Sequence, residues 1–179
     1  MSIIISLSGK KGTGKSFVAN YLSSKYGFWE YAWASPIKEI IAKQLFNLTK
    51  EQLYGKEKEL ILKEWGYSPR QLFQIIGTNC FRNHISKDIW VKIGLKKIQE
   101  KLILPDHQDL VISDSRFPEE INAIKRLKGI TILIQKINET SKDEHQSEIA
   151  LDNYKFDYII KASAGDLNSL YRQIDNIVL

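Results

Sequence analysis

The residues with the clearest chemical meaning lie near the N-terminus, in the segment Gly9–Ser16, which reads GKKGTGKS. It fits the pattern G-x-x-x-x-G-K-[ST], whose glycines let backbone N–H groups turn inward around phosphates. Lys15 is expected to reach the β- and γ-phosphates of ATP, and the Ser16 hydroxyl to ligate Mg²⁺. The loop residues expected to surround the phosphates are Gly9, Lys11, Gly12, Thr13 and Gly14. The pattern therefore predicts a nucleotide-binding loop but does not identify the reaction.

A second candidate group follows the apolar run Leu110–Ser113, which ends at Asp114. This arrangement resembles a Walker B strand, in which the carboxylate orients magnesium and its waters, although a strand-end acid also caps turns. Arg116 would leave the same edge of the sheet, where open α/β sheets bind their ligands. It can bind phosphate through two parallel hydrogen bonds, or it can be an ordinary surface or ion-paired arginine. We expect Lys15, Asp114 and Arg116 to be the catalytic residues, with Ser16 and Asp114 at the metal.

A third pattern lies in a predicted helix that begins at Ser68-Pro69, where serine supplies an N-cap and proline suits the first turn. Arg70 and Gln74 are four residues apart and share one helix face. Any surface helix shows such a polar stripe, so local evidence alone predicts that Arg70 and Arg82 face solvent.

Short apolar runs alternate with longer helical patterns along the chain, as in a parallel sheet with helices on its faces. Strands are expected at Ser2–Ser8, Phe28–Trp33, Asp109–Ser113, Ile130–Ile134 and Phe156–Ile160. Between Thr49 and Leu104 the sequence contains no convincing strand, which indicates a helical insertion. The predicted fold class is α/β: a P-loop NTPase three-layer sandwich with about five parallel strands, a helical substrate-binding insertion and a lid.

One domain is expected, because 179 residues suit a single core. The sheet-containing core is expected at residues 1–34, 105–136 and 152–179, the helical substrate-binding region at about 35–104, and the lid at about 137–151. The net charge of +5 suits an anionic ligand, while no recognised nucleic-acid-binding module occurs. The single cysteine, Cys80, excludes an internal disulfide and a cysteine-based zinc site and favours a cytoplasmic location. No apolar run reaches the ~18 residues that a membrane span needs, so no membrane contact is expected.

Taken together, these residues resemble the phage-type deoxynucleoside monophosphate kinases, over most of the chain. Besides the P-loop, the resemblance rests on SPRQLFQIIGTNCFR at 68–82, on DIWV at 88–91, on SDSRFPEE at 113–120 and on HQSE at 145–148. It implies transfer of the ATP γ-phosphate, with Mg²⁺, to the 5′-phosphate of a deoxynucleoside monophosphate. The substrate-binding residues that it implies are Arg70, Gln74, Thr78, Arg82 and Trp90, although Trp90 also fits core packing.

The resemblance also implies a lid with a His-x-x-Glu element, matched here by His145 and Glu148. Family members often have an arginine entering the lid where this chain has Gln135-Lys136, so Lys136 and Lys142 become the candidate lid cations. Within the helical signature, Asn79 and Phe81 replace an acid and a glycine, which leaves the choice of base open. Phosphoryl transfer to an anionic phosphate needs positioning and charge neutralisation rather than a general base.

Two other classes of protein fit part of the pattern. A different small-molecule kinase on the same fold, of the phosphomevalonate or dephospho-coenzyme A type, would share the P-loop and lid, but segment 68–82 argues against it. An ATP-driven dimeric switch of the partition or septum-site type would explain Lys10 before the P-loop, but not the long helical insertion. The expected partners are therefore ATP and a deoxynucleoside monophosphate, with a homodimer left open.

Overall fold

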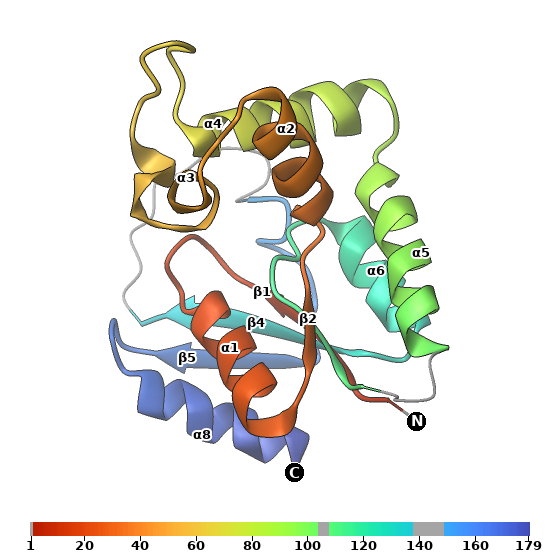
Figure 1. The fold of residues 1–179 in the computed structure, drawn as a ribbon. Coiled ribbons are helices and arrows are strands. Elements are labelled where there is room, and N and C mark those ends of the chain that lie inside the picture. The colour runs from red at the N-terminus through yellow and green to blue at the C-terminus, as the bar shows by residue number, and fades with distance from the viewer. Residues whose placement is uncertain (1, 104–107, 138–148) are drawn as a thin grey trace. The chain divides into compact units, whose positions relative to one another are not determined.

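The computed structural model describes residues 2–103, 108–137 and 149–179 (Figure 1). The chain forms two compact units, one of residues 1–32 and 94–179 and the other of residues 33–93. The first unit contains a five-stranded parallel sheet in the order β2-β3-β1-β4-β5. The predicted α/β fold with about five parallel strands is confirmed.

The strands are β1 (Ile4–Ser8), β2 (Trp29–Tyr31), β3 (Leu110–Ile112), β4 (Ile130–Lys136) and β5 (Tyr158–Ala162). The described part of this unit includes the helices α1 (Lys15–Tyr26), α6 (Pro118–Arg126) and α8 (Leu167–Val178), together with the C-terminal part of α5 (Ile89–Leu102). Helices α1 and α8 lie on one face of the sheet and α6 on the other (Figure 1). Because β1 lies in the middle of the sheet, the loop that follows it leaves from the centre of the carboxyl edge.

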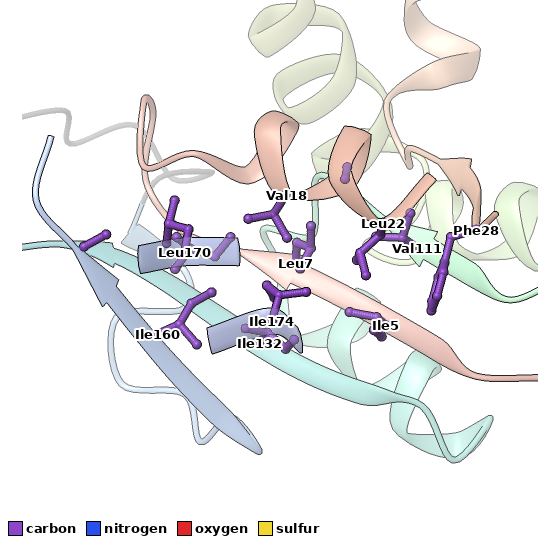
Figure 2. Packing of buried hydrophobic residues seen from close by; sticks show 13 residues of the cluster. Ile5, Leu7, Val18, Leu22, Phe28, Val111, Ile132, Ile160, Leu170 and Ile174 are labelled. Carbon is purple, nitrogen blue, oxygen red and sulfur yellow. The ribbon is translucent and has the colours of Figure 1, made fainter. Parts of the chain in front are cut away.

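An extensive apolar core lies between the sheet and helices α1 and α8 (Figure 2). Leu7 from β1, Leu22 from α1 and Ile174 from α8 have no exposed surface. Burying each such side chain stabilises the fold by about 1.5–3 kcal/mol. The core therefore fixes β1 and α1, the two elements that bracket the predicted nucleotide-binding loop.

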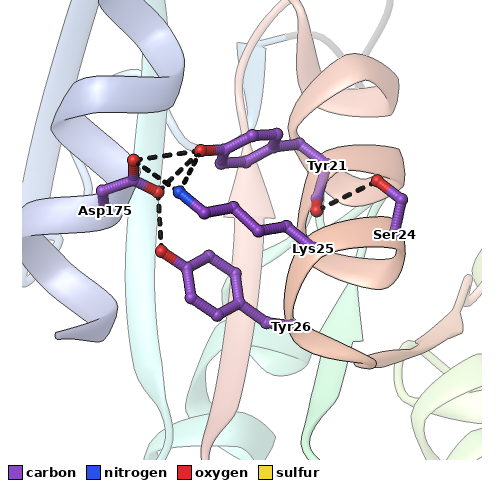
Figure 3. A network of polar contacts seen from close by, with 5 residues as sticks. All are labelled: Tyr21, Ser24, Lys25, Tyr26 and Asp175. Carbon is purple, nitrogen blue, oxygen red and sulfur yellow. Dashed lines mark hydrogen bonds and ion pairs between the residues drawn. The ribbon is translucent and has the colours of Figure 1, made fainter.

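A polar contact joins α1 to α8 beside this core (Figure 3). The Asp175 carboxylate accepts hydrogen bonds from the Tyr21 and Tyr26 hydroxyls, at 2.8 Å each, and from Lys25 Nζ at 2.9 Å. The Tyr21 ring also stacks on Tyr171, with ring centroids 4.0 Å apart. The hydrogen bond from Lys25, more than those from the tyrosines, holds the pKa of Asp175 below its ordinary value.

The second unit is helical, with a small core of Ala42, Leu48 and Leu53. Its elements are η1 (Ile37–Ala42), α2 (Lys43–Leu45), α3 (Lys50–Tyr54), η2 (Lys56–Glu59), α4 (Pro69–Gln74), η3 (Ile75–Arg82) and the start of α5. The predicted N-cap at Ser68 is confirmed, because its side chain accepts from Gln71 N at 3.3 Å. In return, Ser68 N donates to Gln71 Oε1 at 2.8 Å. The β-structure described in this unit is one isolated antiparallel bridge between Leu62 and Tyr67.

The second unit ends at residue 93, inside α5, whereas the sequence pattern extends the helical region to about 104. The division into a core, a substrate-binding region and a lid stays a prediction. Most of the expected lid at 137–151, with Lys142, His145 and Glu148, lies outside the described residues. Among the helices that are described, none is long and apolar enough to cross a membrane.

Candidate functional site

The loop between β1 and α1 has a backbone that requires its glycines. Gly12 and Gly14 have φ angles of 75° and 105°, in the left-handed region that side chains disfavour. Gly9 has a φ of 142°, and a Cβ atom there would lie 2.3 Å from the carbonyl oxygen of Ile134. The loop therefore passes close to strand β4 in a conformation that only glycine adopts without strain.

Lys15 and Ser16 open helix α1 directly after this loop. Lys15 is largely buried, and its ammonium group donates hydrogen bonds to the backbone carbonyls of Gly9 and Lys10, the second at 2.8 Å. Thr13 Oγ1 donates to the same Lys10 carbonyl at 3.0 Å. Ser16 is exposed in the first helical turn, where the positive end of the helix dipole attracts anions. The loop thus places a cation, a hydroxyl and a helix N-terminus together.

The segment that carries Asp114 leaves β3 at the same edge of the sheet. Ser115 N donates to Leu7 O at 3.1 Å, and Ser6 Oγ donates to Ser115 Oγ at 2.8 Å, so β1 holds this segment. Asp114 is half-buried. Burial, and after it the charge of Asp114, raises the pKa of Tyr31 to about 12. The carboxylate therefore lies close enough to the end of β2 to affect its tyrosine.

Ser16 and Asp114 are suitable donors for Mg²⁺. Both offer oxygen, which this ion prefers, and they follow the neighbouring strands β1 and β3. No group of three or more histidine, cysteine, aspartate or glutamate side chains that could hold a metal occurs among the described residues. Magnesium in nucleotide sites needs no such cage, because it keeps several waters and binds substrate phosphates. The donor set therefore fits a nucleotide-bound magnesium.

A cavity of about 310 Å³ lies beside the loop. Its lining includes the cationic residues Lys10, Arg116 and Lys136 and the acid Asp152. Lys136 is the last residue of β4, and its Nζ lies 3.3 Å from the position that a Cβ of Gly12 would take. Arg116 and Lys136, predicted from distant parts of the sequence, thus share one cavity with the loop. No motif had indicated Asp152, since isolated acids carry no local signal.

The predicted acceptor residues lie in the helical unit. Arg70 and Gln74 are half-buried on α4, whereas Thr78 and Arg82 on η3 are each only 5% exposed. The local expectation of a solvent-facing Arg82 is wrong, because its guanidinium turns inward and donates to the carbonyl of Lys87. Segment η3 is π-helical, which changes the spacing of residues around the axis from the ordinary 3.6 per turn.

Trp90 is buried in the same unit, and its Nε1 donates to Gly77 O at 2.8 Å. Phe81 lies against it, with ring centroids 5.3 Å apart. A Cβ at Gly77 would lie 2.6 Å from Ile37 Cδ1, so glycine allows this close packing. These contacts describe a packed side chain, and a role of Trp90 toward substrate stays a prediction.

The five-stranded parallel sheet and the glycine-rich loop after β1 place the chain in the class of P-loop NTPase folds. The fold is similar to that of dephospho-CoA kinase from Campylobacter jejuni, with a TM-score of 0.52, 22% identity and coverage of 99% of this chain and 96% of that one. At this identity the likeness shows the fold alone. The three-layer architecture predicted from the sequence is that of these enzymes.

The sequence comparisons identify the family. A model of the deoxynucleotide monophosphate kinases matches residues 3–60 and 47–174. A protein of Acanthamoeba polyphaga mimivirus, assigned as a deoxynucleotide monophosphate kinase, is 33% identical over 186 residues, covering 98% of this chain and 96% of its own. The deoxynucleotide monophosphate kinase of Enterobacteria phage T4 is 23% identical, with 97% of each chain covered. This chain belongs to the deoxynucleotide monophosphate kinase family, as the resemblance predicted.

Proposed function

We propose that this chain transfers the γ-phosphoryl group of ATP to the 5′-phosphate of a deoxynucleoside monophosphate, giving ADP and the deoxynucleoside diphosphate. The observation that carries the proposal is the glycine-dependent loop with Lys15 beside a cavity lined by Arg116 and Lys136. Membership of the kinase family supplies the reaction class. Both substrates are anions, and the net charge of +5 favours their encounter with the protein.

The donor side of the reaction is assigned to the sheet-containing unit. Backbone N–H groups of the loop and the N-terminus of α1 hold the ATP phosphates, and Lys15 neutralises charge on the β- and γ-phosphates. Lys136 adds a second cation beside Gly12. The backbone of Lys136 is paired with Ala162 of β5, so the sheet fixes the position of this lysine.

Ser16 and Asp114 would hold the magnesium ion. When bound there, the ion would supply positive charge that offsets the negative charge of the ATP phosphates. Asp114 keeps its carboxylate at the edge of the sheet through the β3 strand that precedes it.

Arg116 is assigned to the transferred phosphoryl group and Arg70 and Arg82 to the acceptor phosphate. The acceptor oxygen is already anionic at neutral pH, so no histidine or carboxylate has to remove a proton. The contribution of the arginines is therefore positioning and charge neutralisation.

Gln74 and Thr78, on the same two helical segments as Arg70 and Arg82, are assigned to the remainder of the acceptor nucleotide. Trp90 is assigned to shaping that site through the packing of η3.

The test is ADP formation from ATP and Mg²⁺ with dTMP, dGMP, dCMP and dAMP supplied one at a time. We expect strong turnover with one or two acceptors, little ATP hydrolysis without an acceptor, and loss of turnover in Lys15→Ala. ADP formation that is independent of every acceptor would contradict the proposal and favour the ATP-driven switch. The assay also identifies the accepted base.

The expected location is the cytoplasm, where ATP and nucleotides are available. The homodimer stays a prediction.

A further inference from the structure

Glu120 is a buried carboxylate that the reaction described above does not use. It lies in the first turn of α6 and is 4% exposed. Its Oε2 accepts hydrogen bonds from two consecutive backbone amides, Arg116 N at 2.6 Å and Phe117 N at 3.1 Å. Charge-assisted bonds of this kind are stronger than bonds between neutral groups, and the helix N-terminus stabilises the negative charge.

These bonds act on the segment that carries the site. The segment leaves β3, passes Asp114 and reaches α6 at Pro118. Upstream of Arg116, it is tied to the sheet by the backbone bond from Ser115 N to Leu7 O. At Arg116 itself the acceptor is the side chain of Glu120, which a substitution can remove without changing the strands.

We propose that Glu120 is a positioning residue, which holds the backbone of Arg116 so that Arg116 lines the cavity beside the nucleotide-binding loop. The inference rests on the proposed function, since it assigns Glu120 to the placement of a group that acts on the transferred phosphate. A carboxylate suits this task better than a neutral side chain, because its charge strengthens the two hydrogen bonds that one oxygen accepts at the entrance to the helix. Misplacement of a catalytic group by about 1 Å can reduce a rate about 10²-fold.

The kinetic test compares Glu120→Ala with Glu120→Gln. Alanine removes the acceptor and is expected to lower kcat about 10²-fold while leaving KM for ATP within about twofold. Glutamine retains an oxygen at the same distance along the side chain, so kcat of Glu120→Gln is expected to be at least about tenfold higher than kcat of Glu120→Ala. Equal loss in both variants would overturn the proposal. Glu119→Ala removes an acid from the same helical turn and serves as the matched control, with kcat expected to be unchanged.

A double substitution asks whether Glu120 acts through Arg116. In the Arg116→Ala background, Glu120→Ala is expected to lower kcat by no more than about twofold further, because the group that it positions is gone. An undiminished second loss would show that Glu120 acts elsewhere. Thermal unfolding of each variant identifies any that is not folded. If Glu120→Ala is not folded, the comparison of Glu120→Gln with the wild type decides whether Glu120 acts through Arg116.

Amide hydrogen exchange tests the inference independently of activity. In Glu120→Ala the Arg116 amide is expected to exchange at least about tenfold faster than in the wild type, with the rate largely restored in Glu120→Gln. An unchanged rate would overturn the inference. A wild-type protein without acceptor-dependent ADP formation would instead contradict the proposed function, and the exchange rates would still decide the role of Glu120.

Discussion

The nucleotide-binding loop and the helical segment at 68–82 are both expected to bind phosphate, but they are built differently. The loop depends on backbone conformation: three glycines with positive φ, a buried strand before it and a helix after it. The helical segment depends on side chains, with Arg70 half-buried on α4 and Arg82 buried on the π-helical η3. The first site is recognisable from eight residues, whereas the second is recognisable only through the family.

The two kinds of site are sensitive to different substitutions. A site made of backbone N–H groups tolerates changes in most side chains but not a Cβ at its glycines, because the strain and the collisions fall on the loop itself. A site made of arginines depends on how each side chain is placed, and Arg116 in the sheet-containing unit is of this second kind. Substitutions at arginines should therefore separate binding from turnover more cleanly than substitutions in the loop.

Among the residues that line the cavity, the largest effect is expected for Arg116→Ala. Removing a cation from the transferred phosphate should lower kcat by about 10³-fold or more, with KM for the acceptor within a few-fold of the wild type. Steady-state kinetics at saturating ATP and varied acceptor provide the measurement. A large rise in KM with an unchanged kcat would move Arg116 to the acceptor-binding group.

Lys136→Ala is expected to have a smaller effect, because Lys15 remains. Loss of the Lys136 charge beside Gly12 should lower kcat/KM for ATP about 10-fold to 100-fold. Lys136→Arg keeps a positive charge there and should retain most of the wild-type kcat/KM. Lys161→Ala is the control, since Lys161 is an exposed lysine on β5 that pairs with Gln135. Equal losses at both lysines would indicate a general effect of net charge.

The smallest effect is expected at the contact between α1 and α8, remote from the chemistry. Asp175 has a folded pKa below its ordinary value, so its charge stabilises the fold above the unfolded pKa near 4 and this contribution is lost as the pH falls through the folded value. Asp175→Asn should lower Tm by about 2 °C at pH 7, with the difference shrinking below about pH 4. Calorimetry across this pH range measures it; a difference that grows in acid would contradict the assignment.

Much of the fold could be predicted from local patterns. The strand before Gly9, the helix from Lys15 and the N-cap at Ser68 follow from hydrophobic runs and capping residues, which act over a few positions. The π-helical turns of η3 and the burial of Arg82 could not be predicted in this way. They depend on packing and on the carbonyl of Lys87, which no spacing of residues reveals.

For the site, the loop and Asp114 could be proposed from their motifs, while Arg70 and Arg82 needed the family resemblance. Lys136 was a candidate only as the replacement for an arginine, and its closeness to Gly12 comes from the pairing of β4 with β1. Glu120 belonged to a matched motif but had no assigned role, because its contacts with backbone amides depend on the turn between β3 and α6.

Donor and acceptor are proposed to be held by separate groups of residues, and equilibrium binding measures this separation. ATP and the best acceptor would each be titrated into Lys15→Ala and Arg70→Ala by calorimetry. Lys15→Ala is expected to weaken ATP binding at least about tenfold and to leave the acceptor within about twofold, and Arg70→Ala to do the reverse. If each variant weakens the binding of both ligands equally, or if the two variants show the opposite pattern, ATP and the acceptor are not held by separate groups.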